Sequence, residues 1–399
     1  MCDDVAAEVK GKDILSLGLC RLGHQHLVST VSRLDAGSVV RNNGKEKSVS
    51  VNEGLEAAAS VLASVKNLFL YGWSHSTQDA ISIGLEMAES LGANFNSPAG
   101  FGMIQAITHK IHSKNLEIDL DYVRNNGEFI LYWGSDPTES SHRHPSKFAV
   151  LPRGDKIPEG IESRTIGVVD VRTTETMKMA NHRLIIPPGT DAELLDALSS
   201  DISGKRPITG DVLGISAQEL LGLVRNIQKS DCTVIFYGSG ILNSGDADAN
   251  LLGLQALIEA VRATGKQAFA LPMATETNIM GVAKSTLDQH PVNSLRRLVD
   301  GEFDAALIVG DDPLAELPGP AAKAFAGIPF VYVGPPGGIT DAKARVSIHT
   351  TDSMVDGSGK MRRLDNTEMP FIQWSIRPKQ PVLETDIISR LHEIMKERT

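Results

Sequence analysis

The sequence predicts an α/β fold built on parallel sheets, and three observations support this. Short apolar runs recur along the chain, each ending at a glycine followed by polar or small residues. Stretches with helical spacing of apolar residues lie between these runs. The 399 residues are 41% hydrophobic and 22% charged, close to the average for globular proteins, so disorder and fibrous repeats are excluded. A prior of roughly 100 to 200 residues per domain gives two or three domains.

The apolar runs are typical of strands that are buried on both faces and carry a loop at the carboxyl end. Two of these loops are similar, Gly134 to Pro137 (GSDP) and Gly310 to Pro313 (GDDP). Because Asp-Pro turns commonly follow strands, this similarity alone does not establish a repeat. The predicted strands are NLFLYG (67–72), FILYWG (129–134), TVIFYG (233–238), AALIVG (305–310) and FVYVG (330–334).

Helices are predicted between these strands, and strand alternating with helix indicates parallel sheets covered on both faces. Ser216 followed by Glu219 forms a capping-box pattern, which marks a helix start. The predicted helices are Val51–Val65, Asp79–Leu91, Ala192–Leu198, Ser216–Ile227, Leu251–Thr264 and a C-terminal Asp386–Arg398.

Charge and cysteine content exclude several classes of protein. With 39 basic and 49 acidic residues the net charge is −10, and no basic run could follow a nucleic-acid backbone. No stretch approaches the roughly 18 apolar residues of a membrane span, and acidic residues near the start do not fit a signal peptide, so a cytoplasmic location is expected. Cys2, Cys20 and Cys232 are too few for a disulfide framework, and Cys232 is predicted to be a buried thiol in a strand.

Three segments carry a resemblance to a known superfamily. They are YWGSDPTESSHRHPSK (132–147), VVDVRTTETMKMANHRLIIPPGTDAELLDAL (168–198) and ISAQELLGLVRNI (215–227), in this order. Together they resemble the molybdopterin oxidoreductases. The length, GLCRLGHQHL (18–27) and YGWSHSTQDA (71–80) most resemble the B subunit of formylmethanofuran dehydrogenase, a family that includes the B subunit of the bacterial formyltransferase/hydrolase complex.

The resemblance implies two parallel-sheet α/β domains of the molybdopterin-oxidoreductase type, one of them discontinuous, with a small N-terminal remnant of an iron–sulfur region. Residues 1–50 are expected to form this remnant. Residues 51–102 and 285–355 form the discontinuous domain, 103–284 the inserted domain, and 356–399 a C-terminal segment with its helix.

The same resemblance identifies two places where ligands of the family's cofactors are missing. The cluster needs four cysteines, of which Cys2 and Cys20 match the third and fourth, while the first two would precede Met1. Gly102 stands where the family has the cysteine or selenocysteine that binds tungsten or molybdenum, and glycine offers no ligand atom. Both the metal–pterin cofactor and the cluster are therefore expected to be lost. His109 and His112 could bind a metal, but a solvated helix face explains them better.

Other residues of the former cofactor face are expected to be vestigial. The run His142, Arg143, His144 could bind an anion or a subunit carboxylate, or form a solvated, partly structural loop in which His144 caps the turn. Asp170 and Arg172 could contact a nucleotide or form an ion pair at the sheet edge. The vestigial face comprises Gly134, Asp136, Pro137, His144, Asp170, Arg172, Gly189 and Asp191.

The function implied is that of a non-catalytic, structural B subunit in a formyltransferase/hydrolase complex of one-carbon metabolism linked to tetrahydromethanopterin and methanofuran. The resemblance assigns formyl transfer and hydrolysis to partner subunits, and partners of the A, C and D types are expected. No catalytic residue, metal ligand or cofactor is expected in this chain. Two alternatives stay open: an active tungsten or molybdenum subunit, and a nucleotide-binding module that uses the former pterin site near Asp170.

Overall fold

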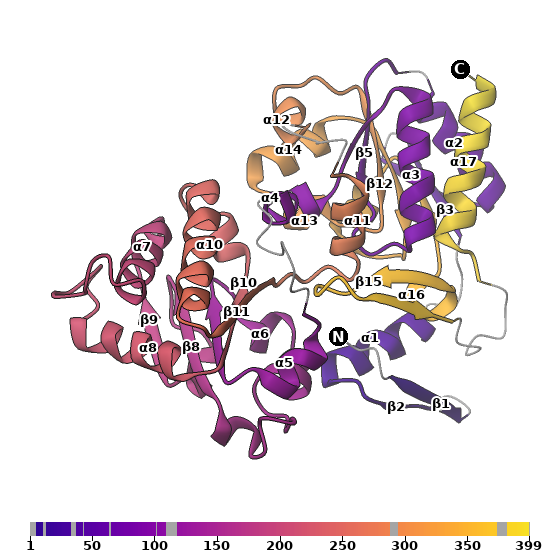
Figure 1. The fold of residues 1–399 in the computed structure, drawn as a ribbon. Helices are drawn as coiled ribbons and strands as arrows, with labels where there is room; N and C mark the ends of the chain where they lie inside the picture. Colours follow the sequence, from indigo (N-terminus) through magenta and orange to yellow (C-terminus); the bar gives the residue numbers. More distant parts are fainter. Residues whose placement is uncertain are drawn as a thin grey trace. The chain divides into compact units, whose positions relative to one another are not determined.

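The computed structural model describes residues 5–10, 13–32, 37–42, 44–63, 65–100, 102–108, 118–287, 294–372 and 381–398. The chain divides into two compact units. Unit 1 comprises Phe101–Thr275 with the short segment Leu364–Thr367. Unit 2 comprises Asp3–Gly100, Glu276–Arg363 and Glu368–Thr399, so its sequence is interrupted by unit 1. Each unit is built around its own sheet (Figure 1).

Unit 1 contains a five-stranded parallel sheet in the order β11-β10-β7-β8-β9. Its central register pairs Tyr132 with Phe236 on one side and with Val168 on the other. The strands are β7 (Phe129–Trp133), β8 (Thr165–Asp170), β9 (His182–Ile185), β10 (Cys232–Tyr237) and β11 (Gln267–Pro272).

The main core of unit 1 forms where three helices cover one face of this sheet. Leu131, Trp133 and Ile235 point into this core, and Tyr132 and Phe236 lie on the opposite face. The three helices are α7 (Asp191–Ile202), α8 (Ala217–Lys229) and α10 (Ala247–Ala263). Shorter elements are α4 (Met103–Thr108), α5 (Leu120–Asn126), α6 (Pro137–Ser140), η2 (Pro145–Ala149), η3 (Gly160–Ser163), η4 (Thr176–Met179) and α9 (Ser239–Leu242).

Unit 2 contains a seven-stranded sheet in the order β4-β3-β14-β13-β12-β5-β6. The five strands from β14 to β6 are parallel, whereas β3 and β4 are antiparallel. The strands are β3 (Ser38–Asn42), β4 (Lys45–Val49), β5 (Leu68–Gly72), β6 (Asn94–Asn96), β12 (Ala305–Val309), β13 (Phe330–Gly334) and β14 (Val346–His349).

Strands β3 and β4, which lie within the predicted remnant 1–50, extend the unit 2 sheet along its β14 edge. The sequence does not show this, since KEKSV in β4 is polar and mostly exposed. Before β3 lie the two-stranded sheet of β1 (Ala6–Lys10) and β2 (Asp13–Leu17) and the helix α1 (Arg21–Ser32).

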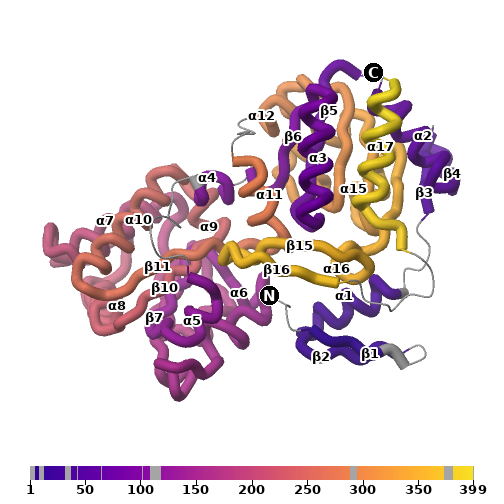
Figure 2. The backbone as a smooth tube through the Cα atoms, turned by 45° about the vertical axis from the view of Figure 1, so that its right-hand side comes forward, coloured from indigo at the N-terminus to yellow at the C-terminus, as the bar shows by residue number. Residues whose placement is uncertain are grey.

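Helices α2 (Val51–Leu62), α3 (Gln78–Leu91) and α17 (Glu384–Arg398) pack together in unit 2, as Figures 1 and 2 both show. A second core holds Phe69, Tyr71, Phe303 and Phe325, whose rings stack or meet edge to face. The remaining elements are η1 (Pro98–Gly100), α11 (Ile279–Ser285), α12 (Ser294–Val299), α13 (Pro313–Glu316), α14 (Gly319–Gly327), α15 (Gly338–Lys343), α16 (Ser353–Asp356), β15 (Gly359–Arg362) and β16 (Glu368–Phe371).

The predicted strands and long helices are present, and Cys232 is buried in β10 as expected. Helix α10 begins earlier than predicted because Asp246 caps it. The Asp246 carboxylate accepts hydrogen bonds from two backbone N–H groups at the start of the helix. The Ser216–Glu219 capping box is confirmed. Among the described residues, no helix is long and apolar enough to cross a membrane.

Candidate functional site

In each unit, the loops at the carboxyl ends of the parallel strands form the natural place for a ligand. In doubly wound sheets, ligands bind where the strand order reverses direction. This point lies between β7 and β10 in unit 1 and between β5 and β12 in unit 2. Most of the predicted vestigial residues fall on the unit 1 edge, and none falls in unit 2.

In unit 1 the two loops at the reversal point touch through their backbones. Gly240 N–H donates to the Gly134 carbonyl at 2.9 Å. A Cβ atom added at Gly134 would lie 2.6 Å from the backbone nitrogen of Ile241, and one at Gly240 would lie 2.5 Å from Gly134 Cα. Gly134 also has a φ of +56°, which favours glycine. These glycines therefore allow close loop packing at the reversal point.

Asp136 is bound by its own unit. Its carboxylate accepts N–H bonds from Glu175 at 3.0 Å and Thr176 at 3.2 Å, and hydroxyl bonds from Thr138 and Thr176 at 2.6 Å each. Burial would raise the pKa of Asp136, but these hydrogen bonds outweigh it and lower the pKa. The carboxylate thus joins the loops after β7 and β8. Pro137 begins α6 directly after it.

The GDDP loop of unit 2 uses the same arrangement. Asp312 accepts N–H bonds from Ile339 and Thr340 at 2.9 Å each, and a bond from the Thr340 hydroxyl. Pro313 then begins α13, as Pro137 begins α6. In both loops an Asp carboxylate accepts hydrogen bonds from two backbone N–H groups and from a threonine hydroxyl, all in the segment that follows the next strand along the chain. The similarity seen in the sequence thus extends to the hydrogen bonding.

His144 is fully buried beside Tyr132 and Phe236, with its ring 4.4 Å from that of Phe236. Within the part of the chain that the structure describes, neither ring nitrogen has a hydrogen-bond partner. Burial lowers the pKa of His144 to about 3, so the ring is neutral at physiological pH. The neutral ring carries no positive charge toward an anion, and the side chain makes no capping hydrogen bond to η2.

The remaining residues of the predicted face also contact their own unit. Asp170 accepts the Arg172 backbone N–H at 3.2 Å, and burial raises its pKa. The Arg172 guanidinium pairs with Glu139 at 3.3 Å, and both side chains are more than half exposed. The Arg172 guanidinium thus pairs with Glu139, and its charge also acts on Asp170, where it opposes the rise in pKa that burial causes.

Gly189 and Asp191 connect the loop after β9 to its surroundings. Gly189, with a φ of +81°, donates its N–H to the Ser244 hydroxyl at 2.9 Å. Asp191 is buried and accepts the indole N–H of Trp133 at 2.8 Å. Both residues therefore have structural contacts that the sequence did not indicate.

Gly102 lies just before α4 in a conformation that excludes larger residues. Its φ is +108°, outside the range that side chains with a Cβ commonly adopt. A Cβ added here would lie 2.7 Å from Leu242 Cβ and 3.3 Å from Leu242 Cγ. A cysteine at this position would be both strained and sterically blocked. Gly102 supplies no ligand atom, and its surroundings do not fit a thiolate ligand.

A polar cluster that no sequence pattern indicated lies at the unit 2 reversal point. Ser74 donates its backbone N–H to Asp311 at 3.0 Å and its hydroxyl to the same carboxylate. His75 Nε2 lies 3.8 Å from Asp311, while His75 Nδ1 lies 3.1 Å from the Thr277 hydroxyl. Burial raises the pKa of Asp311, and His75 and Ser74 oppose this rise. The motif YGWSHS and the GDDP loop were the available signals, but nothing in the sequence showed that they meet.

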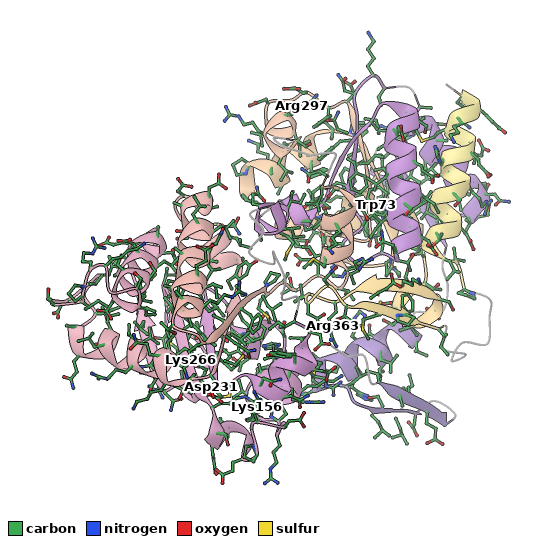
Figure 3. All side chains as sticks on the ribbon, viewed as in Figure 1. Trp73, Lys156, Asp231, Lys266, Arg297 and Arg363 are labelled. Atoms are coloured by element: carbon green, nitrogen blue, oxygen red, sulfur yellow. The ribbon has the colours of Figure 1, made fainter. Side chains whose placement is uncertain are left out.

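Trp73 begins this loop in a strained conformation. It is fully buried with a φ of +66°, which is uncommon for a large side chain. Gly84 of α3 makes room for it, because a Cβ there would lie 2.6 Å from the indole ring. Figure 3 labels Trp73 beside α3 inside unit 2. Strain of this kind is typical of functional loops.

The predicted cluster ligands are only partly described. Cys20 precedes α1, and its sulfur accepts the Gly23 N–H at 3.4 Å. Cys2, His109 and His112 lie outside the described residues. Within the described ranges, no group of three or more His, Cys, Asp or Glu residues could hold a metal ion.

The chain is similar over its length to two curated proteins, although no family model matches it. The B subunit of tungsten-containing formylmethanofuran dehydrogenase 2 from Methanocaldococcus jannaschii is 26% identical, covering 100% of this chain and 96% of the relative. The protein of the same name from Methanococcus maripaludis is 23% identical, covering 98% and 95%. The resemblance to the B subunit of formylmethanofuran dehydrogenase is confirmed.

A solved structure extends this resemblance to the fold. One chain in the crystal structure of the formyltransferase/hydrolase complex from Methylorubrum extorquens, in complex with methylofuran, matches with a TM-score of 0.66. The match covers 90% of this chain and 99% of that chain at 17% identity. The mixed α/β fold with parallel sheets is thereby shown.

Proposed function

We propose that this chain is a non-catalytic, structural B subunit of a formyltransferase/hydrolase complex, and that it holds neither a tungsten or molybdenum pterin nor an iron–sulfur cluster. Gly102 carries the proposal. The family places its metal-binding cysteine at this position, and here the residue has no side chain. Its φ of +108° and the nearby Leu242 both oppose a cysteine.

The predicted cofactor face supports the same proposal. On the predicted vestigial face, Asp136 and the Oδ1 atom of Asp191 accept hydrogen bonds from groups of unit 1. The glycine loops at the reversal point are in direct backbone contact. A pyrophosphate needs free N–H donors and room to approach the backbone. In unit 1 the described hydrogen bonds already use several of these N–H donors, and the close packing of the loops reduces the room near the backbone.

In the proposed assembly, other subunits carry the chemistry. A D-type subunit transfers the formyl group from formyl-tetrahydromethanopterin to a methanofuran-like carrier, and an A-type subunit hydrolyses it to formate. With a C-type subunit they are the partners proposed for this chain, whose role is to hold the assembly together. Missing domains of larger relatives would leave surface for such partners to cover.

The proposal is tested by reconstituting the complex with and without this chain. Formyl transfer and formate release are measured, together with reduction of a viologen dye by the formylated carrier. We expect the complex to assemble only with this chain, to release formate, and to reduce no dye. Dye reduction that depends on this chain would instead establish the active redox role.

A further inference from the structure

The polar cluster at the unit 2 reversal point contains a hydroxyl, an imidazole and a carboxylate in series. The Thr277 hydroxyl lies 3.1 Å from His75 Nδ1, and His75 Nε2 lies 3.8 Å from Asp311 Oδ1. Thr277 is exposed and the His75 side chain is 41% exposed, whereas the Asp311 side chain is fully buried. An accessible hydroxyl is thus followed by a base and then by a buried anion, the order that activates the nucleophile of hydroxyl-dependent hydrolases.

The hydrogen bonds determine which ring nitrogen of His75 can act as a base. The backbone N–H of Thr277 donates to His75 Nδ1 at 3.4 Å. Because an N–H group can only donate, Nδ1 is the unprotonated nitrogen in this arrangement. The ring proton is then on Nε2, the nitrogen that faces Asp311. His75 Nδ1 therefore accepts from the Thr277 hydroxyl and can take its proton.

Further hydrogen bonds join the two segments on both sides of His75. Asn278 donates its backbone N–H to the Ser74 carbonyl at 2.7 Å and its side-chain amide to the Ser76 carbonyl at 2.8 Å. Asn278 is fully buried. Ser74 in turn donates its N–H to Asp311 at 3.0 Å. The segments that carry the hydroxyl, the imidazole and the carboxylate are therefore fixed by the surrounding fold, which is the preorganisation that a catalytic site needs.

This series lies at the place where open α/β sheets bind their ligands. His75 follows β5 and Asp311 follows β12, the two strands between which the strand order reverses. The loop after β5 begins at Trp73, whose φ of +66° is uncommon for a large side chain. Backbone strain of this kind clusters at active sites. The position in the fold and the backbone conformation thus agree with the order of the three groups.

We propose that Thr277 is a nucleophile, that His75 is its general base and that Asp311 positions His75, so that this site hydrolyses carboxylic esters. Thr277 Oγ1 forms a bond to the carbonyl carbon of the ester, and His75 Nδ1 takes the hydroxyl proton. The bond from that carbon to the leaving oxygen then breaks, and Nδ1 gives the proton to the departing alcohol. Water attacks the acyl group through the same proton transfers, which releases the acid and restores Thr277. Ester and water are the only reactants that this sequence needs.

The charge around His75 selects the class of ester. The carboxylates of Glu276, Asp311, Asp312 and Glu316 act on one another here, and the charge of His75 opposes them. Negative potential at this edge repels an anionic substrate and attracts a cationic one. Neutral and cationic esters are therefore the substrates of this site. Formyl transfer and formyl hydrolysis stay with the other subunits of the proposed complex, and ester hydrolysis does not depend on them.

The test is ester hydrolysis by the purified full-length chain. The neutral probe is p-nitrophenyl acetate, the cationic probe is acetylthiocholine, and the anionic probe is p-nitrophenyl hydrogen succinate. We expect saturable hydrolysis of the first two, and a kcat/KM for the anionic probe about tenfold or more below that for p-nitrophenyl acetate. No hydrolysis above the rate in buffer would overturn the proposal. Equal kcat/KM values for the anionic and neutral probes would overturn the assigned class of substrate.

Variants assign the activity to the three residues. Thr277→Val removes the hydroxyl and should abolish hydrolysis, whereas Thr277→Ser keeps a hydroxyl and should retain it. His75→Gln should lower kcat by about a hundredfold or more, the usual contribution of a general base. Asp311→Asn should lower kcat by about tenfold or more while KM stays within about twofold, because the buried carboxylate acts through His75 and does not touch the substrate.

The matched control for His75→Gln is His142→Gln, because His142 is an exposed histidine of unit 1. It should leave hydrolysis unchanged. Hydrolysis that persists in Thr277→Val, or that His142→Gln lowers as much as His75→Gln does, would overturn the proposal. If Asp311→Asn does not fold, the comparison of Thr277→Val with Thr277→Ser decides, since Thr277 is exposed and neither change disturbs the core.

Discussion

Restoring the missing cysteine by Gly102→Cys should destabilise unit 1. A side chain forced into an unfavourable backbone region costs about 1 to 3 kcal/mol. The Cβ would also lie 2.7 Å from Leu242 Cβ, and overpacking of this kind costs about 1 to 3 kcal/mol. Together the free energy of unfolding should fall by about 2 to 6 kcal/mol.

The assay is denaturant unfolding followed by circular dichroism and tryptophan fluorescence, with linear extrapolation to water. Two glycines of the same unit provide matched controls. Gly204 has a φ of +73° with nothing within 4 Å of a Cβ, so Gly204→Cys measures backbone strain alone, about 1 to 2 kcal/mol. Gly210 has neither strain nor close neighbours, so Gly210→Cys should change stability by no more than about 0.5 kcal/mol. If Gly102→Cys costs no more than Gly210→Cys, the reasoning is refuted.

Three further predictions concern buried polar groups. Relative to the unaltered chain, Glu384→Gln should be more stabilising at pH 8 than at pH 5. The folded-state pKa of Glu384, about 7, exceeds the usual 4.5, so the unaltered chain loses about 3 kcal/mol of stability as the pH rises through this range. A pH-independent effect of the substitution would contradict this. Asn278→Ala should lower the free energy of unfolding by about 2 to 4 kcal/mol, because the Asn278 side-chain amide donates to the Ser76 carbonyl and accepts from the Arg362 N–H. The control Asn243→Ala, at an exposed position, should lower it by less than about 0.5 kcal/mol. Asp136→Ala should lower the free energy of unfolding by about 2 to 4 kcal/mol at neutral pH. This loss should become smaller as pH falls below about 4, because the pKa of Asp136 is lowered in the folded state and its stabilising effect is lost when the carboxylate is protonated. A loss that stays constant down to pH 2 would count against the hydrogen-bonded carboxylate.

The sequence predicted the α/β class because strands buried on both faces are written as continuous apolar runs, such as FILYW in β7. It did not predict β3 and β4. An edge strand is exposed on one side, and the mostly exposed KEKSV of β4 lacks an apolar pattern. Local pattern therefore predicts the centre of a sheet better than its edge.

The site was predicted less completely for a different reason. Gly102 and the GSDP loop could be selected by resemblance, but the contacts of Asp136 and Asp191 depend on residues about 40 to 60 positions away. The unit 2 cluster joins Ser74 to Asp311, 237 positions apart. Such contacts follow from strand order, which no local pattern contains. The burial of His144 was likewise invisible in SHRHPSK, a segment that is polar in composition.

Whether this polypeptide still carries a heavy redox metal is decided most directly by elemental analysis. Tungsten, molybdenum and iron per chain are measured by mass spectrometry in the complex purified from its native source, with pterin determined in parallel. We predict tungsten, molybdenum and pterin far below one per chain, and no iron attributable to this polypeptide. Tungsten or molybdenum near one per chain, accompanied by pterin, would contradict the account.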